Sequence, residues 1–308
     1  MRYRVRQDSR LQYRTGVTDA RLNLRLRPVT WPGQVVRDFT MELDVPPTER
    51  TEGPGPYLSH VTTLRYSGRL SSLRIVTEFT AELSPLPVPD ITPPVAELRQ
   101  MASEARTLGP LAPAAYLYGA SMTPPDEAIG AWAAPDLLPD TPVLEAARAL
   151  AMRIHREFAY APGTTTSRTL PAEAFAAKAG VCQDFAHVMI VALRMHGIPA
   201  GYVSGYLRTL PPAGRARLVG ADAMHAWAAV WCGPGAGWIG IDPTNDSLAR
   251  EDHIVLGMGR DYADVTPVNG VFVGGGKQTT DFRVDVVPVD ETMAEIAPPA
   301  SASARRTG

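Results

Sequence analysis

The chain has few of the features that would place it in a specialised class of protein. Its 308 residues include only two cysteines, Cys182 and Cys232, which is too few for a disulfide framework and typical of a reducing compartment. The net charge is −2, so there is no strong general attraction to nucleic acid or to an anionic membrane. No apolar run reaches the length of a membrane span, and no apolar segment follows the basic residues at the N-terminus. We therefore expect a cytoplasmic protein that binds neither nucleic acid nor membrane.

Lysine is also scarce, since Lys178 and Lys277 are the only two and arginine carries nearly all the positive charge. We interpret this as coding bias and not as a binding site. The rest of the composition is ordinary for a globular protein, with 45% hydrophobic and 20% charged residues. The length is sufficient for two domains with sizeable cores.

The first part of the chain has the pattern of β structure. Residues 1–84 contain runs such as 21–27 and 73–80 that alternate polar and apolar residues, as strands with one solvent-facing side do. They predict a β-rich N-terminal domain. The arginines of 21–27 are best interpreted as a solvated strand face, with an anion-binding stripe as the alternative. Residues 85–142 then begin with a proline-rich connector and continue into a helical segment.

The second predicted domain covers residues 143–290. Its sequence predicts helices at 143–158 and 183–196. Strands are expected at four places in the core, namely 201–207, 225–232, 237–242 and about 281–288. From residue 291 to residue 308 the composition changes to alanine, proline, serine and arginine, which predicts a disordered tail.

Cys182 lies where the helix of residues 183–196 is expected to begin. Gly180 interrupts the preceding segment, and Gly197 and Pro199 end the helix. The unpaired N–H groups and the dipole at a helix start favour an anion, so a thiolate is stabilised at this position. A buried structural cysteine is the alternative.

A possible partner for this thiol comes from two predicted strands that form a hairpin. Residues 225–232 alternate and place His225 on one face with Trp227, and the turn at residues 233–237 leads into residues 238–242. In such a hairpin Asp242 lies opposite or diagonal to Trp227 and on the same face as His225. Asp242 can then hold one nitrogen of His225 while the other faces Cys182, which is the arrangement used in acyl transfer.

The other five histidines fit this role less well. His187 lies about 140° round the predicted helix from Cys182 and is expected to point away. His196 is at the helix end, where a cation is favourable. His155 lies in a segment that looks like a surface helix, and His253 lies in one that looks like a loop. His60 belongs to a separate region of the chain.

Four ordered motifs carry a family resemblance. They are Gly-Val-Cys-Gln-Asp-Phe-Ala-His at 180–187, Gly-Ile-Pro-Ala-Gly-Tyr-Val-Ser-Gly-Tyr at 197–206, His-Ala-Trp at 225–227 and Gly-Trp-Ile-Gly-Ile-Asp-Pro-Thr-Asn at 237–245. They resemble the bacterial transglutaminase-like superfamily, and residues 259–268 and the N-terminal 80 or so residues are similar to further parts of the same group. The resemblance implies an α+β fold with a papain-like core, in which a cysteine-bearing helix packs on an antiparallel sheet behind a β-rich N-terminal region. It also implies Cys182 as nucleophile, His225 as base and Asp242 as orienter. Met224 departs from the family, which more often has a small residue there.

The expected reaction is acyl transfer from a peptide or protein amide through a thioester. We favour a cysteine peptidase or amidase, because hydrolysis needs fewer parts than transfer to an amine. Transglutaminase-type cross-linking is the second hypothesis, a non-catalytic binding or scaffold module the third, and arylamine acyl transfer a further use of the same three residue types. No cofactor and no metal are predicted, and the sequence does not give the oligomeric state.

The second oxyanion donor and the substrate groove are less well defined. Papain-like enzymes often take this donor from an upstream glutamine, but no glutamine lies between Met101 and Cys182. A backbone N–H, Gln183 or Trp227 must then serve. The candidates for the groove are aromatic residues, although large aromatic residues on strands are more often in the core. They are Tyr206, Trp227, Trp231, Trp238 and Tyr262.

Overall fold

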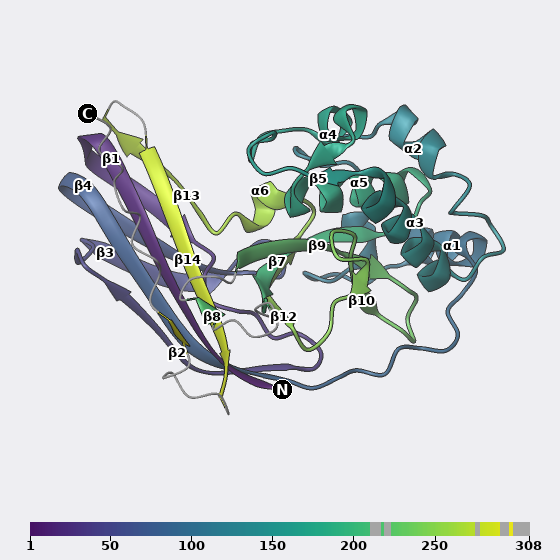
Figure 1. Ribbon diagram of the computed structural model, residues 1–308, viewed down its shortest axis with the longest axis horizontal. Coiled ribbons are helices and arrows are strands. Elements are labelled where there is room, and N and C mark those ends of the chain that lie inside the picture. Colours follow the sequence, from purple (N-terminus) through teal and green to yellow (C-terminus); the bar gives the residue numbers. More distant parts are fainter. Residues whose placement is uncertain (210–216, 219–222, 275–277, 290–295, 298–308) are drawn as a thin grey trace.

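The computed structural model describes residues 1–209, 217–218, 223–274, 278–289 and 296–297. It contains a sheet of long strands and a smaller antiparallel sheet, with most of the helices gathered over the smaller one (Figure 1). The α+β class and the β-rich N-terminal region expected from the sequence are confirmed. Within the described part of the chain, no helix combines the length and the apolar character needed to cross a membrane.

The large sheet is organised around its first strand, β1. Its side chains alternate between buried and exposed over most of its length, as the sequence pattern predicted. On one side β1 pairs antiparallel with β4, and β4 in turn pairs with β2 and β3. On its other side β1 pairs with two strands from the far end of the chain, β14 and β13. The strands are β1 (Arg2–Leu24), β2 (Gln34–Leu43), β3 (Glu49–Pro54), β4 (His60–Leu83), β13 (Val268–Val273) and β14 (Gln278–Pro288).

The last strand predicted for the core belongs to the large sheet. The strand predicted at about 281–288 exists as part of β14, but it pairs with β1 and not with the core sheet. The last two strands within the expected unit of residues 143–290, β13 and β14, are therefore part of the N-terminal sheet. Val284 and Val286 are buried there, in a cluster that includes Tyr3 and Val5 of β1.

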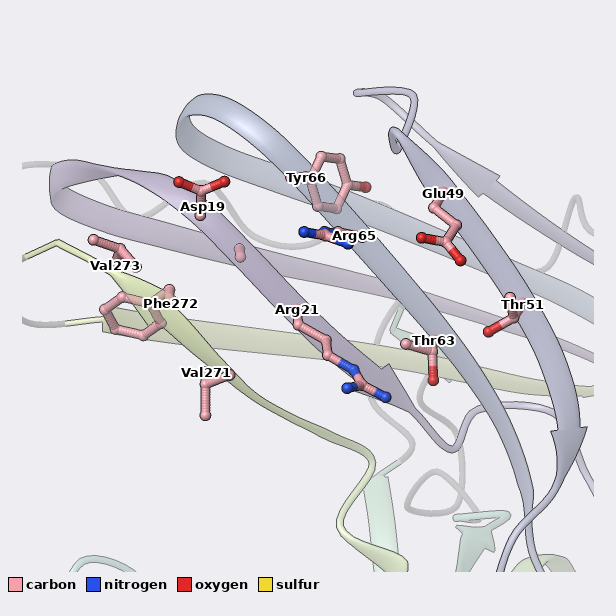
Figure 2. A pocket seen from close by; sticks show the side chains of 11 residues that line it. Asp19, Arg21, Glu49, Thr51, Thr63, Arg65, Tyr66, Val271, Phe272 and Val273 are labelled. Carbon is pink, nitrogen blue, oxygen red and sulfur yellow. The ribbon is translucent and has the colours of Figure 1, made fainter.

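One face of the large sheet carries an open hollow of about 620 Å³ (Figure 2). Arg21 of β1 lies directly opposite Arg65 of β4. On the outer side of β1, Val271 of β13 is paired with Arg21, and on the outer side of β4, Glu49 of β3 is paired with Arg65. Asp19 also lines the hollow, so it carries charges of both signs. This is the solvated strand face that the sequence predicted for Arg21.

The helices agree with most of the sequence predictions. Those expected at 143–158 and 183–196 are present as α3 (Val143–Glu157) and α5 (Cys182–Met195), and α5 is buried on nearly all sides. The helical part of residues 85–142 consists of α1 and α2 with a short 3-10 helix between them. The remaining helical elements are α1 (Val95–Glu104), η1 (Pro113–Tyr116), α2 (Glu127–Ala133), α4 (Pro171–Ala177) and α6 (Tyr262–Val265).

The smaller sheet holds the strands predicted at 201–207, 225–232 and 237–242. Its order is β11-β10-β9-β7-β12, and α5 packs on the face that carries Ala226, Ala228 and Val230. The two-residue strand β11 and the strand β12 were not predicted, and the sequence around His253 was interpreted as a loop. The strands are β7 (Ala200–Leu207), β9 (Ala223–Trp231), β10 (Trp238–Asp242), β11 (Ser247–Leu248) and β12 (His253–Gly259).

Two short pairs of strands complete the structure. β5 (Ala159–Tyr160) pairs in parallel with β6 (Ala179–Gly180) just before α5. β8 (Arg217–Leu218) pairs in parallel with β15 (Ile296–Ala297). The disordered tail predicted for residues 291–308 otherwise lies outside the described residues and stays a prediction.

Candidate active site

Cys182 is the first residue of α5, where the sequence placed it. The carboxylate of Asp184 accepts a 2.8 Å hydrogen bond from the Val181 N–H and so caps the helix. A Cβ atom on Gly180 would lie 2.6 Å from the same carboxylate, so only glycine allows this close approach. The cap fixes the first turn, and the half-buried Cys182 thiol with it.

The loop before α4 is tied to this first turn by two side chains. The Thr165 hydroxyl donates to Oδ2 of Asp184 at 2.7 Å, and Nε2 of Gln183 donates to the Ser167 carbonyl at 3.3 Å. Gln183, proposed from the sequence as an oxyanion donor, therefore uses one of its two side-chain N–H groups to bind the loop. The same contacts place the loop beside Cys182.

The β9–β10 hairpin brings His225 and Asp242 together. Ile241 pairs with Ala228 in register, so the next residue, Asp242, lies beside Trp227 and on the face of His225, as expected. Nε2 of His225 is 2.7 Å from Oδ2 of Asp242. Because a carboxylate only accepts, Nε2 carries the hydrogen, and Nδ1 is left for Cys182.

The electrostatics of the three groups are strongly coupled. Burial of the imidazole lowers the pKa of His225, but hydrogen bonds with Asp242 and Cys182, together with their negative charges, outweigh it and raise the pKa to about 10. Burial also acts to raise the pKa of Asp242, yet hydrogen bonds from His225, His253 and Asn245 hold that pKa well below its usual range. The arrangement therefore favours an imidazolium between two acidic groups.

Asp242 is completely buried and receives five hydrogen bonds. Its Oδ1 atom accepts from the backbone N–H groups of Thr244 and Asn245 at 2.9 and 3.3 Å. Its Oδ2 atom lies 2.7 Å from Nε2 of His225, 2.7 Å from Nδ2 of Asn245 and 3.1 Å from Nε2 of His253. These donors explain how the carboxylate stays charged inside the protein.

His253 is one neighbour of the site that the sequence interpretation missed. It was assigned to a loop, but it begins β12, is 9% exposed and reaches the carboxylate of Asp242. The reactive atoms of His225, Asp242 and His253 lie within 4.8 Å of one another, a spacing that a metal ion can use. Hydrogen bonds to Asp242 already account for this cluster. The absence of a metal stays a prediction.

Two of the expected groove residues are too deeply buried to contact a substrate. Trp227 is 0% exposed and packs against the rings of His225 and His253. Tyr206 is likewise 0% exposed, and its hydroxyl donates to Gln7 of the large sheet. These corrections follow the general tendency of aromatic strand residues to be in the core.

The other aromatic candidates lie in two different places. Trp231 pairs with Trp238 at the far end of the hairpin, and both line a separate hollow of about 670 Å³. Six residues of strand place Trp231 roughly 20 Å from His225. Tyr262 is half-buried and its ring meets Tyr202 edge-on, while its N–H donates to the buried His187.

Two tyrosines that the sequence interpretation did not single out lie near Cys182. Burial raises the pKa of both Tyr160 and Tyr202, and the negative charge of Cys182 raises each further, so both phenols lie within its electrostatic reach. Tyr160 is 57% exposed and lies on β5, whereas Tyr202 is buried beneath the site. Only the pairing of β5 with β6 brings Tyr160 to the helix start, which a local pattern does not reveal.

The second cysteine has a different environment. Cys232 follows β9, is 1% exposed and is not part of a disulfide. Burial raises the pKa of its thiol to about 12. It is therefore an internal reference for the reactivity of Cys182.

The family models match both halves of the chain. The transglutaminase-like superfamily matches residues 132–243, and the bacterial transglutaminase-like N-terminal region matches residues 3–82. The first match contains Cys182, His225 and Asp242.

Individual proteins extend this comparison. The uncharacterized protein Rv2569c of Mycobacterium tuberculosis is 37% identical over 303 residues, covering 94% of this chain and 93% of that protein. A protein-glutamine gamma-glutamyltransferase of Pseudomonas aeruginosa is 39% identical over 93 residues, which are 29% of this chain and 14% of that protein. The crystal structure of a candidate cysteine protease from Cytophaga hutchinsonii has the same fold, with a TM-score of 0.72 and 19% identity over 95% of this chain and 92% of that chain. The chain belongs to the transglutaminase-like superfamily and carries the N-terminal region of its bacterial members.

Proposed function

We propose that this protein is a cysteine-dependent acyl-transfer enzyme that acts on amide bonds of peptides or proteins. Cys182 is the nucleophile, His225 the base and Asp242 the residue that orients it. The observation that carries the proposal is the position of His225, whose Nε2 lies 2.7 Å from Oδ2 of Asp242 and whose pKa is raised by Asp242 and Cys182 together. A nucleophile, a base and an orienting carboxylate in this order make up an acyl-transfer triad.

The reaction follows from these roles. His225 takes the proton of Cys182 on its Nδ1 atom, which gives a thiolate–imidazolium pair. The thiolate bonds to the amide carbonyl carbon, and the C–N bond breaks as His225 gives that proton to the leaving amine. The resulting thioester is then attacked by water, which returns a proton to His225. Release of the carboxylic acid restores Cys182.

The developing oxyanion needs hydrogen-bond donors near Cys182. The Cys182 N–H belongs to the first turn of α5, where helices leave their N–H groups unpaired, and we assign it as one donor. Such a donor is typically worth about 10²–10³ in rate. Gln183 remains a candidate for the second donor, because only one of the two hydrogens of its side-chain NH2 group is used by the Ser167 carbonyl.

Hydrolysis by a peptidase or amidase is the form of this reaction that we favour, because water needs no dedicated acceptor site. Transfer to an amine is the second candidate, and the 93-residue similarity to the Pseudomonas aeruginosa protein-glutamine gamma-glutamyltransferase supports it. A non-catalytic module is the third. We also propose that the protein works in the cytoplasm, since both of its cysteines are free, and cell fractionation tests this.

The reactivity of Cys182 tests the proposal. The rate of alkylation by iodoacetamide is measured for Cys182 and Cys232 from pH 5 to pH 9 by peptide mass spectrometry, in the wild type and in His225→Ala. We expect Cys182 to react much faster than Cys232 below pH 7, and about tenfold or more slowly in the variant. Equal rates for the two cysteines would mean that the triad is not assembled, and the non-catalytic module would then be the better hypothesis.

A second experiment separates hydrolysis from transfer. Glutamine-containing peptides are incubated with the protein and a fluorescent primary amine, with Cys182→Ala as the control. Peptide cleavage or ammonia release without incorporation of the amine supports hydrolysis. Incorporation of the amine in preference to water supports a transglutaminase.

A further inference from the structure

We propose that His253 is a positioning residue of the triad, and that the N-terminal sheet holds it in place. His253 shares the carboxylate of Asp242 with His225 and so moderates the strength with which Asp242 holds the His225 imidazolium. This inference rests on the proposed function. It also gives the N-terminal region a defined part in the chemistry of the second half of the chain.

The first argument is the hydrogen-bond geometry of His253. Its Nδ1 atom accepts a 3.4 Å hydrogen bond from the Arg250 N–H, so Nε2 is the ring nitrogen that acts as a donor. That nitrogen donates to Oδ2 of Asp242 at 3.1 Å. The ring of Trp227 meets His253 edge-on at 5.1 Å and fixes its orientation. His253 is therefore a fixed donor to the oxygen atom that also holds His225.

The second argument is competition at one oxygen atom. Oδ2 of Asp242 serves His225, His253 and Asn245 together. Each additional donor stabilises part of the negative charge on Oδ2. The hydrogen bond from His225 is therefore weaker than it would be to a carboxylate with fewer donors. An imidazolium that is held too strongly gives up its proton reluctantly, and the leaving amine needs that proton. Because the carboxylate is shared, His225 can donate its proton to the leaving amine as well as accept a proton.

The third argument is the way in which β12 is anchored to the large sheet. On one side of His253, the Tyr3 hydroxyl of β1 donates to Asp252 at 2.8 Å. On the other side, the amide of Gln34 in β2 donates to the Val255 carbonyl and accepts from the Val255 N–H, both at 2.8 Å. Gln34 is 5% exposed, so water does not compete well for these bonds. The N-terminal sheet thus holds β12 immediately before and after His253.

The charged and titratable groups around the shared carboxylate come from four elements. Cys182 lies at the start of α5, His225 on β9, Asp242 on β10 and His253 at the start of β12. Beyond His253, Asp252 forms an ion pair with Arg208 at 3.7 Å. A change in the titration of His225 must be interpreted against all of these groups.

The experiment measures the titration of His225 directly. The chain has six histidines, so NMR signals of isotope-labelled imidazoles can be assigned by single substitutions. His253→Phe keeps a ring and removes the donor, whereas a His253→Gln side chain can still place an N–H near Oδ2. We expect the His225 pKa to rise by about half to one unit in His253→Phe, the effect of one lost hydrogen bond, and to return towards the wild-type value in His253→Gln. His196→Gln, a change in a histidine bonded to Gly130, is the control and leaves the His225 pKa unchanged.

The support from the N-terminal sheet is tested in the same way. Gln34→Ala removes both bonds to Val255, and we expect a smaller rise in the His225 pKa that disappears when it is combined with His253→Phe. Tyr3→Phe removes only a hydroxyl and gives a second variant if Gln34→Ala folds poorly. Arg65→Ala, in the hollow of the same sheet, is the matched control and produces no shift.

The possible outcomes separate this inference from the proposed function. A Cys182→Ser variant in which the His225 pKa does not fall would show that Cys182 and His225 are uncoupled, and the proposed function would fail. If that pKa falls as expected, but His253→Phe leaves the His225 pKa unchanged or lowers it, the role of His253 is refuted while the triad stands. Additive shifts from Gln34→Ala and His253→Phe would overturn the link to the N-terminal sheet.

Discussion

The proton on His225 connects the chemistry of the site to the stability of the protein. The pKa of this buried imidazole is about 10 in the folded chain and about 6.5 when unfolded. A raised folded pKa contributes stability that is fully present below pH 6.5 and is lost as the pH rises towards 10, because the folded state binds the extra proton in that window. We expect the melting temperature to fall between pH 6.5 and 10, and to fall less in His225→Gln, which has no titrating proton. Parallel curves for the two proteins would contradict the raised pKa of His225.

At the residue level, the sequence was most informative where chemistry and local pattern coincide. Cys182, His225 and Asp242 could be placed because a helix start and a two-stranded hairpin are both local structures. His253 could not, because β12 is buried on both faces and therefore lacks the alternation that marks a half-exposed strand. Tyr206 was misjudged for a related reason, since only the packing of the two sheets shows that its hydroxyl meets Gln7.

Among the secondary-structure elements, the start of α5 is the one whose geometry the site depends on most. In Gly180→Ala the new Cβ would lie 2.6 Å from the Asp184 carboxylate and push it away from the Val181 N–H. Loss of a helix cap costs about 1–2 kcal/mol, and the first turn that carries Cys182 loosens. We expect a lower unfolding free energy in chemical denaturation and slower alkylation of Cys182. Gly53→Ala is the matched control, because its Cβ meets nothing within 4 Å. Equal effects of the two substitutions would refute the role of the close approach at Gly180.

The large sheet shows why the position of a strand is easier to predict than the strand it pairs with. Residues of β14 have an alternating pattern that identifies a strand, but the pattern does not say which strand it pairs with. β1 has 23 residues, and β14 and β13 cover successive parts of the same side of it. That pairing joins residues more than 240 positions apart, so it depends on tertiary packing that no local window contains. The helices α3 and α5 were predicted well because their apolar stripes are local.

At the scale of the whole molecule, the two sheets are joined by a shared apolar core. One buried cluster contains Tyr3 and Val286 of the large sheet together with Tyr206 and Ile254 of the smaller one. The polar bonds that hold β12 lie beside this cluster, at Gln34 and at Asp252. Because apolar burial and polar contacts act across the same boundary, we expect the two halves of the chain to unfold together.

Val286 allows that expectation to be tested. Its side chain is 0% exposed in the shared core, so Val286→Ala removes buried methyl groups and leaves a cavity, at a cost of about 2 kcal/mol. Val273→Ala, in the same sheet but 63% exposed, is the matched control and should change stability by less than about 0.5 kcal/mol. Four of the five tryptophans, all except Trp31, follow β4 in the chain and pack in the cores around α5 and the smaller sheet, so their fluorescence reports on the part that carries the triad. We expect Val286→Ala to lower the melting temperature by the same amount in fluorescence and in far-ultraviolet circular dichroism. If the fluorescence transition stayed in place while the circular dichroism transition moved, the catalytic half would be stable without the N-terminal sheet, and the coupling through β12 would lose its structural basis.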